Sequence, residues 1–119
     1  MNANELRIGN LIFSKETNEF QKITGITEEN VYFNSITFDY PCLEEIEPIE
    51  LTQEFLLNFG FEWKNNGLRK SNFCVRDLGS GWIIFMSNEM FNFNIELKYV
   101  HQLQNLYFAL TGTELAYEK

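Results

Sequence analysis

The feature that most constrains the fold is a strict two-residue alternation near the end of the chain. The segment FNFNIEL, residues 91–97, alternates apolar with polar residues: Phe91, Phe93, Ile95 and Leu97 against Asn92, Asn94 and Glu96. Successive side chains of a strand point to opposite faces of a sheet, so this period predicts a strand with one buried and one wet face. Such a strand needs neighbouring strands and a covering layer.

The segments before it provide the neighbours. FEWK, residues 61–64, is followed by Asn65, Asn66 and Gly67, a combination typical of tight hairpin turns. NFCVRD (72–77) and WIIFM (82–86) are two β-favouring runs joined by the glycine-rich link LGSG. Together with residues 91–97 they predict an antiparallel sheet of three or four strands.

A short helix with both ends marked precedes this sheet, in LTQEFLLNFG, residues 51–60. Thr52 is a good N-cap, and Leu51 with Leu56 has the spacing of a hydrophobic staple. Gly60 can take the left-handed conformation that ends a helix, with Phe61 folding back on Leu56.

The run VHQLQNLYFALTG, residues 100–112, predicts a second helix that Gly112 ends. At 100° per residue one stripe gathers the residues expected to lie on the sheet: Val100, Leu103, Leu106, Tyr107 and Leu110. A second stripe, His101, Gln104 and Phe108, points away from that core, and it is either covered by the N-terminal half of the chain, which is the favoured case, or left exposed for another chain. Because His101 is the chain's single histidine, it is read as a surface or interface residue on this helix.

The N-terminal part predicts a meander of short antiparallel strands at residues 11–13, 20–26 and 31–35, separated by polar turns. In FQKITGI neither alternating face is purely apolar, which fits a small SH3-like barrel or a sheet edge. Residues 42–49 are read as a strand, although their spacing also suits a helical turn ended by Pro48. The fold class is therefore α+β: a β-meander, a helix, an antiparallel sheet and a C-terminal helix. The 119 residues predict a single compact domain, 1–119, with sub-units 1–50 and 51–119.

Charge is unevenly distributed along the chain. The first 60 residues hold eleven Asp and Glu against three Lys and Arg, and the remaining residues hold six of each, so the first half carries the whole net charge of −8. A dense acidic run, Glu44, Glu45, Glu47, Glu50 and Glu54, surrounds Pro48. Such a half repels phosphate, and direct nucleic-acid binding by it is not expected. In the second half Lys64, Arg69, Lys70 and Arg76 could form a weak positive patch, but solvated cations are the favoured interpretation.

The sequence offers little for catalysis. A hydrolase built on Cys42 or Cys74 with His101, oriented by Asp39 or Asp77, has no local signature, so no enzyme activity is expected. One histidine and two distant cysteines do not make a metal site, and no cofactor is expected. The longest apolar run, WIIFM, is too short for a membrane helix, and the N-terminus lacks the pattern of a secretory signal. A cytoplasmic protein with no membrane partner is expected.

Three blocks, LRIGNLIF (6–13), IEPIELTQEFLLNFGFE (46–62) and YVHQLQNLYFALTGTEL (99–115), resemble a family of short uncharacterised proteins encoded by gut anaerobic bacteria and their phages or mobile elements. The resemblance covers nearly the whole chain and is loosest over residues 62–95. It implies an intracellular location and a link to phage or mobile-DNA biology, and it carries no catalytic residue.

Three functions compete. The first is a non-enzymatic protein-binding module that offers His101, Gln104 and Phe108 to a protein partner or to a second copy in a homodimer. The second is an inhibitor in which Glu44, Glu45, Glu47 and Glu50 mimic the phosphates that a DNA- or RNA-binding protein expects. The third is the Cys/His hydrolase.

Overall fold

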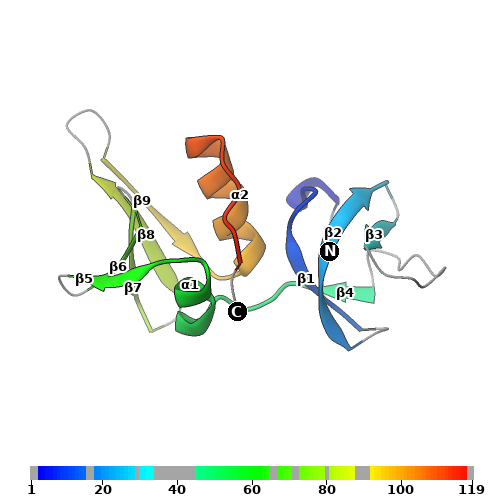
Figure 1. Cartoon of the computed structure of the whole chain (residues 1–119), viewed down its shortest axis with the longest axis horizontal. Helices are drawn as coiled ribbons and strands as arrows, with labels where there is room; N and C mark the ends of the chain where they lie inside the picture. Colours follow the sequence, from blue (N-terminus) through cyan, green and yellow to red (C-terminus); the bar gives the residue numbers. More distant parts are fainter. Residues whose placement is uncertain are drawn as a thin grey trace. The chain divides into compact units, whose positions relative to one another are not determined.

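A computed structural model describes residues 3–15, 18–28, 30–33, 45–64, 67–70, 73–79, 81–87 and 92–117. Two antiparallel sheets and two α-helices confirm the α+β class (Figure 1). The chain divides into two compact units. Unit 1 comprises Met1–Glu50 and Tyr99–Glu114, and unit 2 comprises Leu51–Lys98 and Leu115–Lys119. The boundary at residue 50 is the expected one, whereas the C-terminal helix groups with the N-terminal half. A single compact domain stays a prediction.

Unit 1 contains a four-stranded sheet with the order β3-β2-β1-β4. Its strands are β1 (Leu11–Ser14), β2 (Glu19–Ile26), β3 (Val31–Phe33) and β4 (Ile46–Glu47), and a 3-10 turn, η1 (Ala3–Glu5), precedes them. All pairings are antiparallel, as the meander predicts. Of the residues 42–49 predicted as a strand, Ile46–Glu47 form β4, and 42–44 lie outside the described residues.

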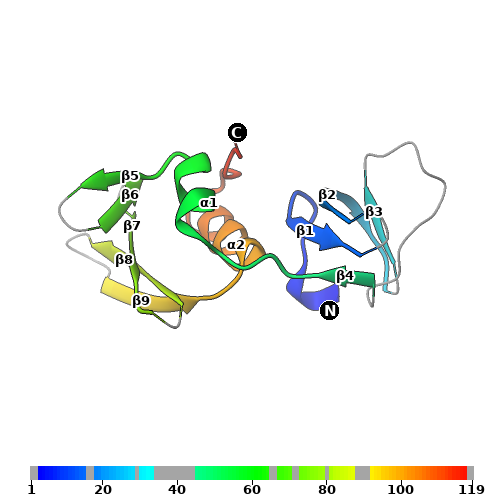
Figure 2. The same ribbon diagram turned by 90° about the horizontal axis from the view of Figure 1, so that it is seen from below.

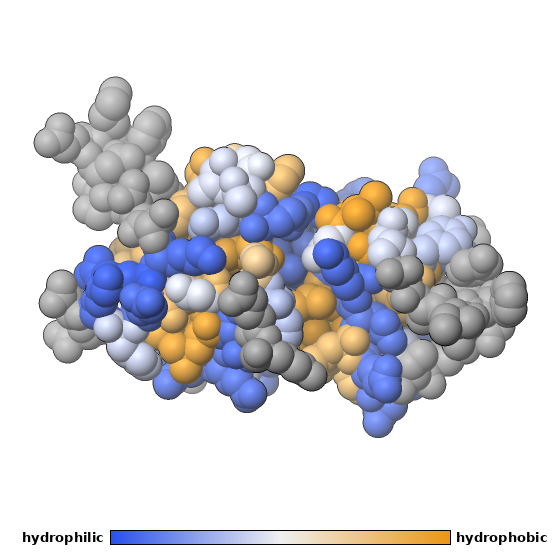
Figure 3. Space-filling model, viewed as in Figure 1, coloured by the Kyte–Doolittle hydropathy of each residue, from blue (hydrophilic) through white to orange (hydrophobic). Residues whose placement is uncertain are grey.

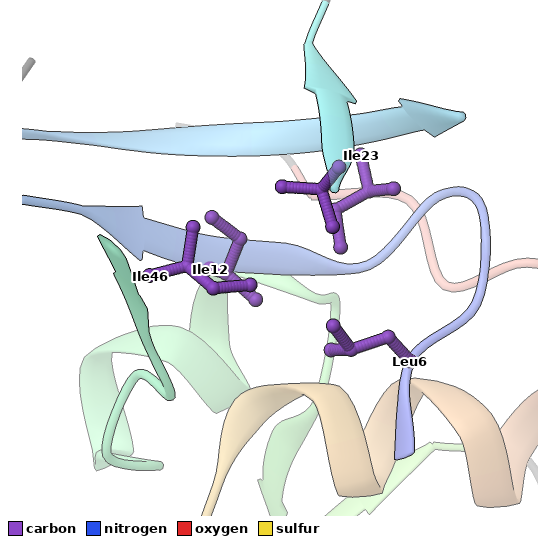
Figure 4. Packing of buried hydrophobic residues seen from close by; sticks show 5 residues of the cluster. Leu6, Ile12, Ile23 and Ile46 are labelled. Carbon is purple, nitrogen blue, oxygen red and sulfur yellow. The ribbon is translucent and has the colours of Figure 1, made fainter. Parts of the chain in front are cut away.

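The core of unit 1 is small and aliphatic. It consists of one residue from the start of the chain and one from each of the four strands: Leu6, Ile12, Ile23, Val31 and Ile46. Figure 4 shows Ile12 of β1 and Ile46 of β4 side by side, with Leu6 approaching from the segment that precedes β1. In β2 only Ile23 is buried, which explains why neither face of that strand is apolar throughout.

Unit 2 contains a five-stranded sheet with the strand order β5-β6-β7-β8-β9 (Figure 2). The strands are β5 (Glu62–Lys64), β6 (Gly67–Lys70), β7 (Phe73–Asp77), β8 (Trp82–Ser87) and β9 (Asn92–Leu97). There are five strands, where three or four were expected, because the hairpin of β5 and β6 continues the sheet through the pairing of Leu68 with Val75. The row Leu68, Val75 and Ile84 is fully buried and forms the centre of the covered face.

Helix α1 (Gln53–Asn58) is capped at both ends as its sequence predicts. The Thr52 side chain accepts a hydrogen bond from the backbone N–H of Phe55 at 3.3 Å. At the other end Gly60 has a φ of +93°, and the backbone N–H of Phe61 donates to the carbonyl of Leu56 at 3.0 Å. These bonds satisfy backbone groups that a helix end leaves without partners, so a helix of under two turns is stable here.

Aromatic side chains hold α1 within unit 2. Tyr117 lies against Phe55 and Phe59, with ring centroids 5.4 and 5.5 Å apart. Trp82 on β8 donates its indole N–H to the carbonyl of Leu51 at 2.8 Å, a buried hydrogen bond between the sheet and the segment before α1. A buried indole needs such a partner, because an unpaired N–H in the core is costly.

Helix α2 (Val100–Thr111) starts after Tyr99 and ends at Gly112, whose φ is +72°. The Gln102 side chain accepts a hydrogen bond from the Tyr99 backbone N–H at 3.0 Å. The expected apolar stripe is buried at Val100, Leu103 and Tyr107, but Leu110 is 43% exposed. Within the described part of the chain no helix is both long and apolar enough to span a membrane.

Candidate functional site

The face of α2 that carries Gln104 contacts strand β1 inside unit 1. The Gln104 side-chain oxygen accepts a hydrogen bond from the backbone N–H of Leu11 at 2.8 Å, and its amide nitrogen donates to the carbonyl of Gly9 at 3.2 Å. Gln104 is only 2% exposed. A primary amide can accept and donate in this way, as the peptide group of an adjacent strand would. The residue therefore joins the helix to the strand.

Asn105 extends this joint to the start of the chain. Its side-chain oxygen accepts hydrogen bonds from the Asn10 amide at 2.8 Å and from Arg7 Nε at 3.3 Å, and its nitrogen donates to the carbonyl of Glu5 at 3.0 Å. Asn10 is fully buried. The sequence analysis did not single out Arg7, Asn10 or Asn105. The block LRIGN holds two of them, but their partners lie more than 90 residues away, so no local pattern reveals the network.

Phe108 lies one turn beyond Gln104, and its ring packs against Arg7. The guanidinium carbon lies 4.3 Å from the ring centroid, a cation–π contact. The same guanidinium forms a two-nitrogen ion pair with the Glu114 carboxylate. Phe108 remains 37% exposed.

His101 was expected at the surface or at an interface, and its 4% exposure rules out the surface position. Its ring stacks on that of Tyr99, with centroids 5.9 Å apart and planes 11° apart. Its Nδ1 has no hydrogen-bond partner among the described residues. Burial lowers the pKa of His101 below its ordinary value near 6.5, while the Glu5 carboxylate acts in the opposite direction. The imidazole is thus held in its neutral form at neutral pH.

The three residues of the second α2 stripe therefore differ in their surroundings. His101 and Gln104 are buried and Phe108 is exposed, because unit 1 supplies β1 and the N-terminal turn as a second packing surface for this helix. The stripe was expected to point away from the core. A role for these residues in partner binding stays a prediction. Of the three side chains, that of Phe108 is the one a partner could contact, because the other two are buried.

The acidic run is partly described. Glu45, Glu47 and Glu50 are exposed, and Glu44 lies outside the described residues. Glu47 forms an ion pair with Lys15 at 3.5 Å, with both side chains about half exposed. Glu47 lies on β4, whereas Glu45 precedes the strand in a 3-10 turn.

The cysteines provide no nucleophile with a base beside it in the described chain. Cys74 is a buried free thiol on β7 in unit 2, and His101 belongs to unit 1. Cys42 and Asp39 lie outside the described residues. No group of three or more potential metal-ligating side chains occurs in the part of the chain that the structure describes.

The four cations considered for a positive patch, Lys64, Arg69, Lys70 and Arg76, do not share one surface. Lys64, Arg69 and Arg76 lie on one face of the five-stranded sheet by the register of β5, β6 and β7. Lys70 follows Arg69 and so points to the opposite face, where its ammonium donates to the carbonyl of Phe59 at 2.7 Å. That contact places a cation at the C-terminal end of α1, where the helix dipole favours positive charge.

No family model, no curated protein and no solved structure matches this chain. The function must therefore be argued from the chain's own residues.

Proposed function

We propose that the protein is a non-enzymatic, intracellular protein-binding module whose unit 1 binds a basic protein surface. One observation carries the proposal: the net charge of −8 belongs entirely to unit 1, which has eleven Asp and Glu against three Lys and Arg, whereas unit 2 has six of each. A compact unit with this imbalance attracts cationic surfaces and repels nucleic acid.

The pairing within unit 1 supports the proposal. Two of its three cations are engaged with carboxylates of the same unit, Arg7 with Glu114 and Lys15 with Glu47. Exposed carboxylates at Glu28, Glu45 and Glu50 form no ion pair among the described residues. A partner with Lys or Arg at matching positions would gain complementary pairs, and electrostatic steering would speed its association.

A second candidate function follows from the exposed carboxylates of Glu45, Glu47 and Glu50, which are close together in the chain. Clustered exposed carboxylates can stand in for phosphates, so the partner would then be the nucleic-acid-binding surface of a DNA- or RNA-binding protein. The two functions share a basic partner. They differ in whether a nucleic acid competes with the protein for that partner.

A binding titration tests the proposal. A fluorescently labelled lysine 20-mer should bind the wild-type protein, with an affinity that falls as salt rises, because exposed charges are screened beyond about 8 Å at physiological ionic strength. The triple change Glu45→Gln, Glu47→Gln and Glu50→Gln should weaken binding by about tenfold or more. A matched triple change in unit 2, Glu54→Gln, Glu62→Gln and Glu96→Gln, should leave it within about twofold.

Equal losses in the two triple variants would contradict the proposal, since binding would then follow total charge and not the surface of unit 1. The physiological partner is sought by affinity capture from the native host with the wild-type protein and both variants, read by mass spectrometry. A partner retained by the wild type and the unit 2 variant but lost with the unit 1 variant supports it. Release of that partner by DNA or RNA would favour the phosphate-mimicking function.

A further inference from the structure

Unit 2 has a second charged surface, of the opposite sign, that the proposal for unit 1 does not use. We name it the cationic face. It is the side of the five-stranded sheet opposite α1, and its members among the described side chains are Glu62, Lys64, Arg69, Cys74, Arg76, Ile83, Phe85 and Glu96. Helix α1 and the segment before it lie on the other side, where Lys70 donates to the carbonyl of Phe59 and Trp82 to that of Leu51 (Figure 2).

At the centre of the cationic face lie Gly67 and Cys74. Both residues are buried, although they point to the side of the sheet opposite α1. A Cβ on Gly67 would lie 2.7 Å from Cys74 Sγ and 3.4 Å from Cγ of Arg76. Because Gly67 has no side chain, the thiol of Cys74 occupies the space above its Cα, and the aliphatic part of Arg76 lies next to the same space. Long basic side chains commonly cover apolar surface in this way and keep the charged group in water.

Three cations, Lys64, Arg69 and Arg76, lie on the same face as Gly67 and Cys74. Arg69 Nε donates to the backbone carbonyl of Lys64 at 3.2 Å, which places the two residues together, and the Arg76 guanidinium lies 5.7 Å from the ring centroid of Phe85. Arg69 and Arg76 form no ion pair with a carboxylate among the described residues. Lys64 does pair with Glu62 at 3.7 Å, but both side chains are more than 60% exposed, so the pair is weak.

The apolar part of the face lies on the neighbouring strand. Ile83 and Phe85, on β8, are half-buried, although they point to the side of the sheet opposite α1. Their register partners on β7 are Arg76 and Cys74, so apolar and cationic groups stand next to each other. A ligand that fits must present negative charge beside an apolar group. On the face drawn in Figure 3, apolar residues likewise lie in small groups between hydrophilic ones.

We propose that the cationic face binds an acidic peptide segment of a partner protein, with Arg69, Arg76 and Lys64 pairing its carboxylates and Phe85 with Ile83 packing against an apolar residue beside them. Guanidinium groups bind carboxylates in a bidentate manner, and such pairs are stronger beside a partly buried surface. The site belongs to unit 2 and has the opposite charge to the acidic surface of unit 1.

Charge favours a peptide over a nucleic acid as the occupant. A polyphosphate is drawn by the long-range field of many cations, yet this chain carries a net charge of −8 and the face itself includes Glu62 and Glu96. A short segment with a few carboxylates depends on local pairing, which three cations and an apolar neighbour can provide.

The test measures binding of two labelled probes to the full chain by fluorescence anisotropy. The first is a nine-residue peptide with four glutamates on each side of one phenylalanine, and the second is a 20-nucleotide oligo-dT. The peptide should bind wild type and lose about fivefold or more in affinity with Arg76→Gln or Arg69→Gln. Arg76→Lys should recover part of the loss. Lys22→Gln, which makes the same charge change on an exposed residue of unit 1, should change affinity by less than about twofold.

Circular dichroism and urea unfolding establish that each variant is folded before its affinity is compared. No measurable binding of the peptide by folded wild-type protein would overturn the proposal, as would equal losses with Arg76→Gln and Lys22→Gln. Tighter, Arg76-dependent binding of the oligonucleotide would also overturn it and assign the face to nucleic acid. Because the lysine probe for unit 1 and the glutamate probe for this face are independent, either proposal can fail alone.

Discussion

Gln104 of helix α2 accepts a 2.8 Å hydrogen bond from the backbone N–H of Leu11, so a helix side chain occupies the place of a neighbouring strand beside β1. The same amide donates to the carbonyl of Gly9, and both atoms of the side chain are therefore used. This relationship makes the C-terminal helix a structural part of unit 1.

Replacing Gln104 tests how much this joint contributes. Gln104→Leu would leave a backbone N–H and a carbonyl without partners in a partly buried place, and each costs about 1–3 kcal/mol. We expect the free energy of unfolding to fall by about 2–4 kcal/mol, measured by urea denaturation. Gln53→Leu, at an exposed position of α1, should change it by less than about 0.5 kcal/mol. Similar values for the two variants would mean that the Gln104 amide contributes no net stability.

The burial of His101 predicts a pH dependence of stability. Its pKa is lowered in the folded state, mainly by burial, so below pH 6.5 the unfolded chain binds more protons than the folded one. Stability from this residue is therefore fully present above pH 6.5 and is lost as pH falls below it towards the folded pKa. A single proton limits the slope to about 1.4 kcal/mol per pH unit.

The measurement compares urea unfolding of wild type and His101→Phe between pH 7.5 and 5.5. Phenylalanine retains a ring that can stack on Tyr99 and removes the titrating group. The difference in unfolding free energy between the two proteins should shift in favour of the variant as pH falls. A difference that stays constant over this range would show that His101 does not titrate differently in the two states.

Gly60 and Gly79 provide a matched pair for testing backbone strain. Both have positive φ, +93° and +87°, but a Cβ at Gly60 would meet the ammonium of Lys70 at 3.0 Å, whereas Gly79 has open space. Gly79→Ala should cost about 1–2 kcal/mol from backbone conformation alone. Gly60→Ala should cost at least as much, because Lys70 must also leave the carbonyl of Phe59. Thermal or urea unfolding of both variants measures this. A smaller loss at Gly60 would argue that the end of α1 can rearrange.

Phe108 distinguishes a folded-state contact from an interface. Because its ring is 37% exposed and stacks on Arg7, Phe108→Asp should stay folded, with a loss of about 1 kcal/mol or less as the new carboxylate lies near the guanidinium. Leu110→Asp, at a more exposed site on the same helix, is the control. Size-exclusion chromatography with light scattering reports the mass. A fall in mass for Phe108→Asp but not for Leu110→Asp would indicate a homodimer through Phe108, and an unfolded variant would contradict the observed exposure.

Local chemistry explains why much of the secondary structure could be predicted. The N-cap at Thr52, the left-handed residue at Gly60 and a strand over Asn92–Leu97 depend on groups within a few positions of one another, and the structure confirms each. The alternation in that strand did not predict burial correctly throughout, because Leu97 is buried but Ile95, expected on the same buried face, is 41% exposed. The α+β class follows from these elements in their order. The short β5 strand adds to the sheet because a hairpin edge can continue it, which a pattern of three or four strands does not specify.

By itself, then, the sequence determined the helices, the strands and the concentration of negative charge in one part of the chain, because periodicity, capping and net charge are properties of neighbouring residues. Only the tertiary structure decided that His101 and Gln104 are buried and that Asn105 forms a hydrogen bond with Asn10. It also decided what Lys70 contacts on the face of the sheet opposite Arg69, namely the carbonyl of Phe59. The physical reason is that a helix stripe or a strand face is polar or apolar locally, but its burial depends on which distant segment packs against it.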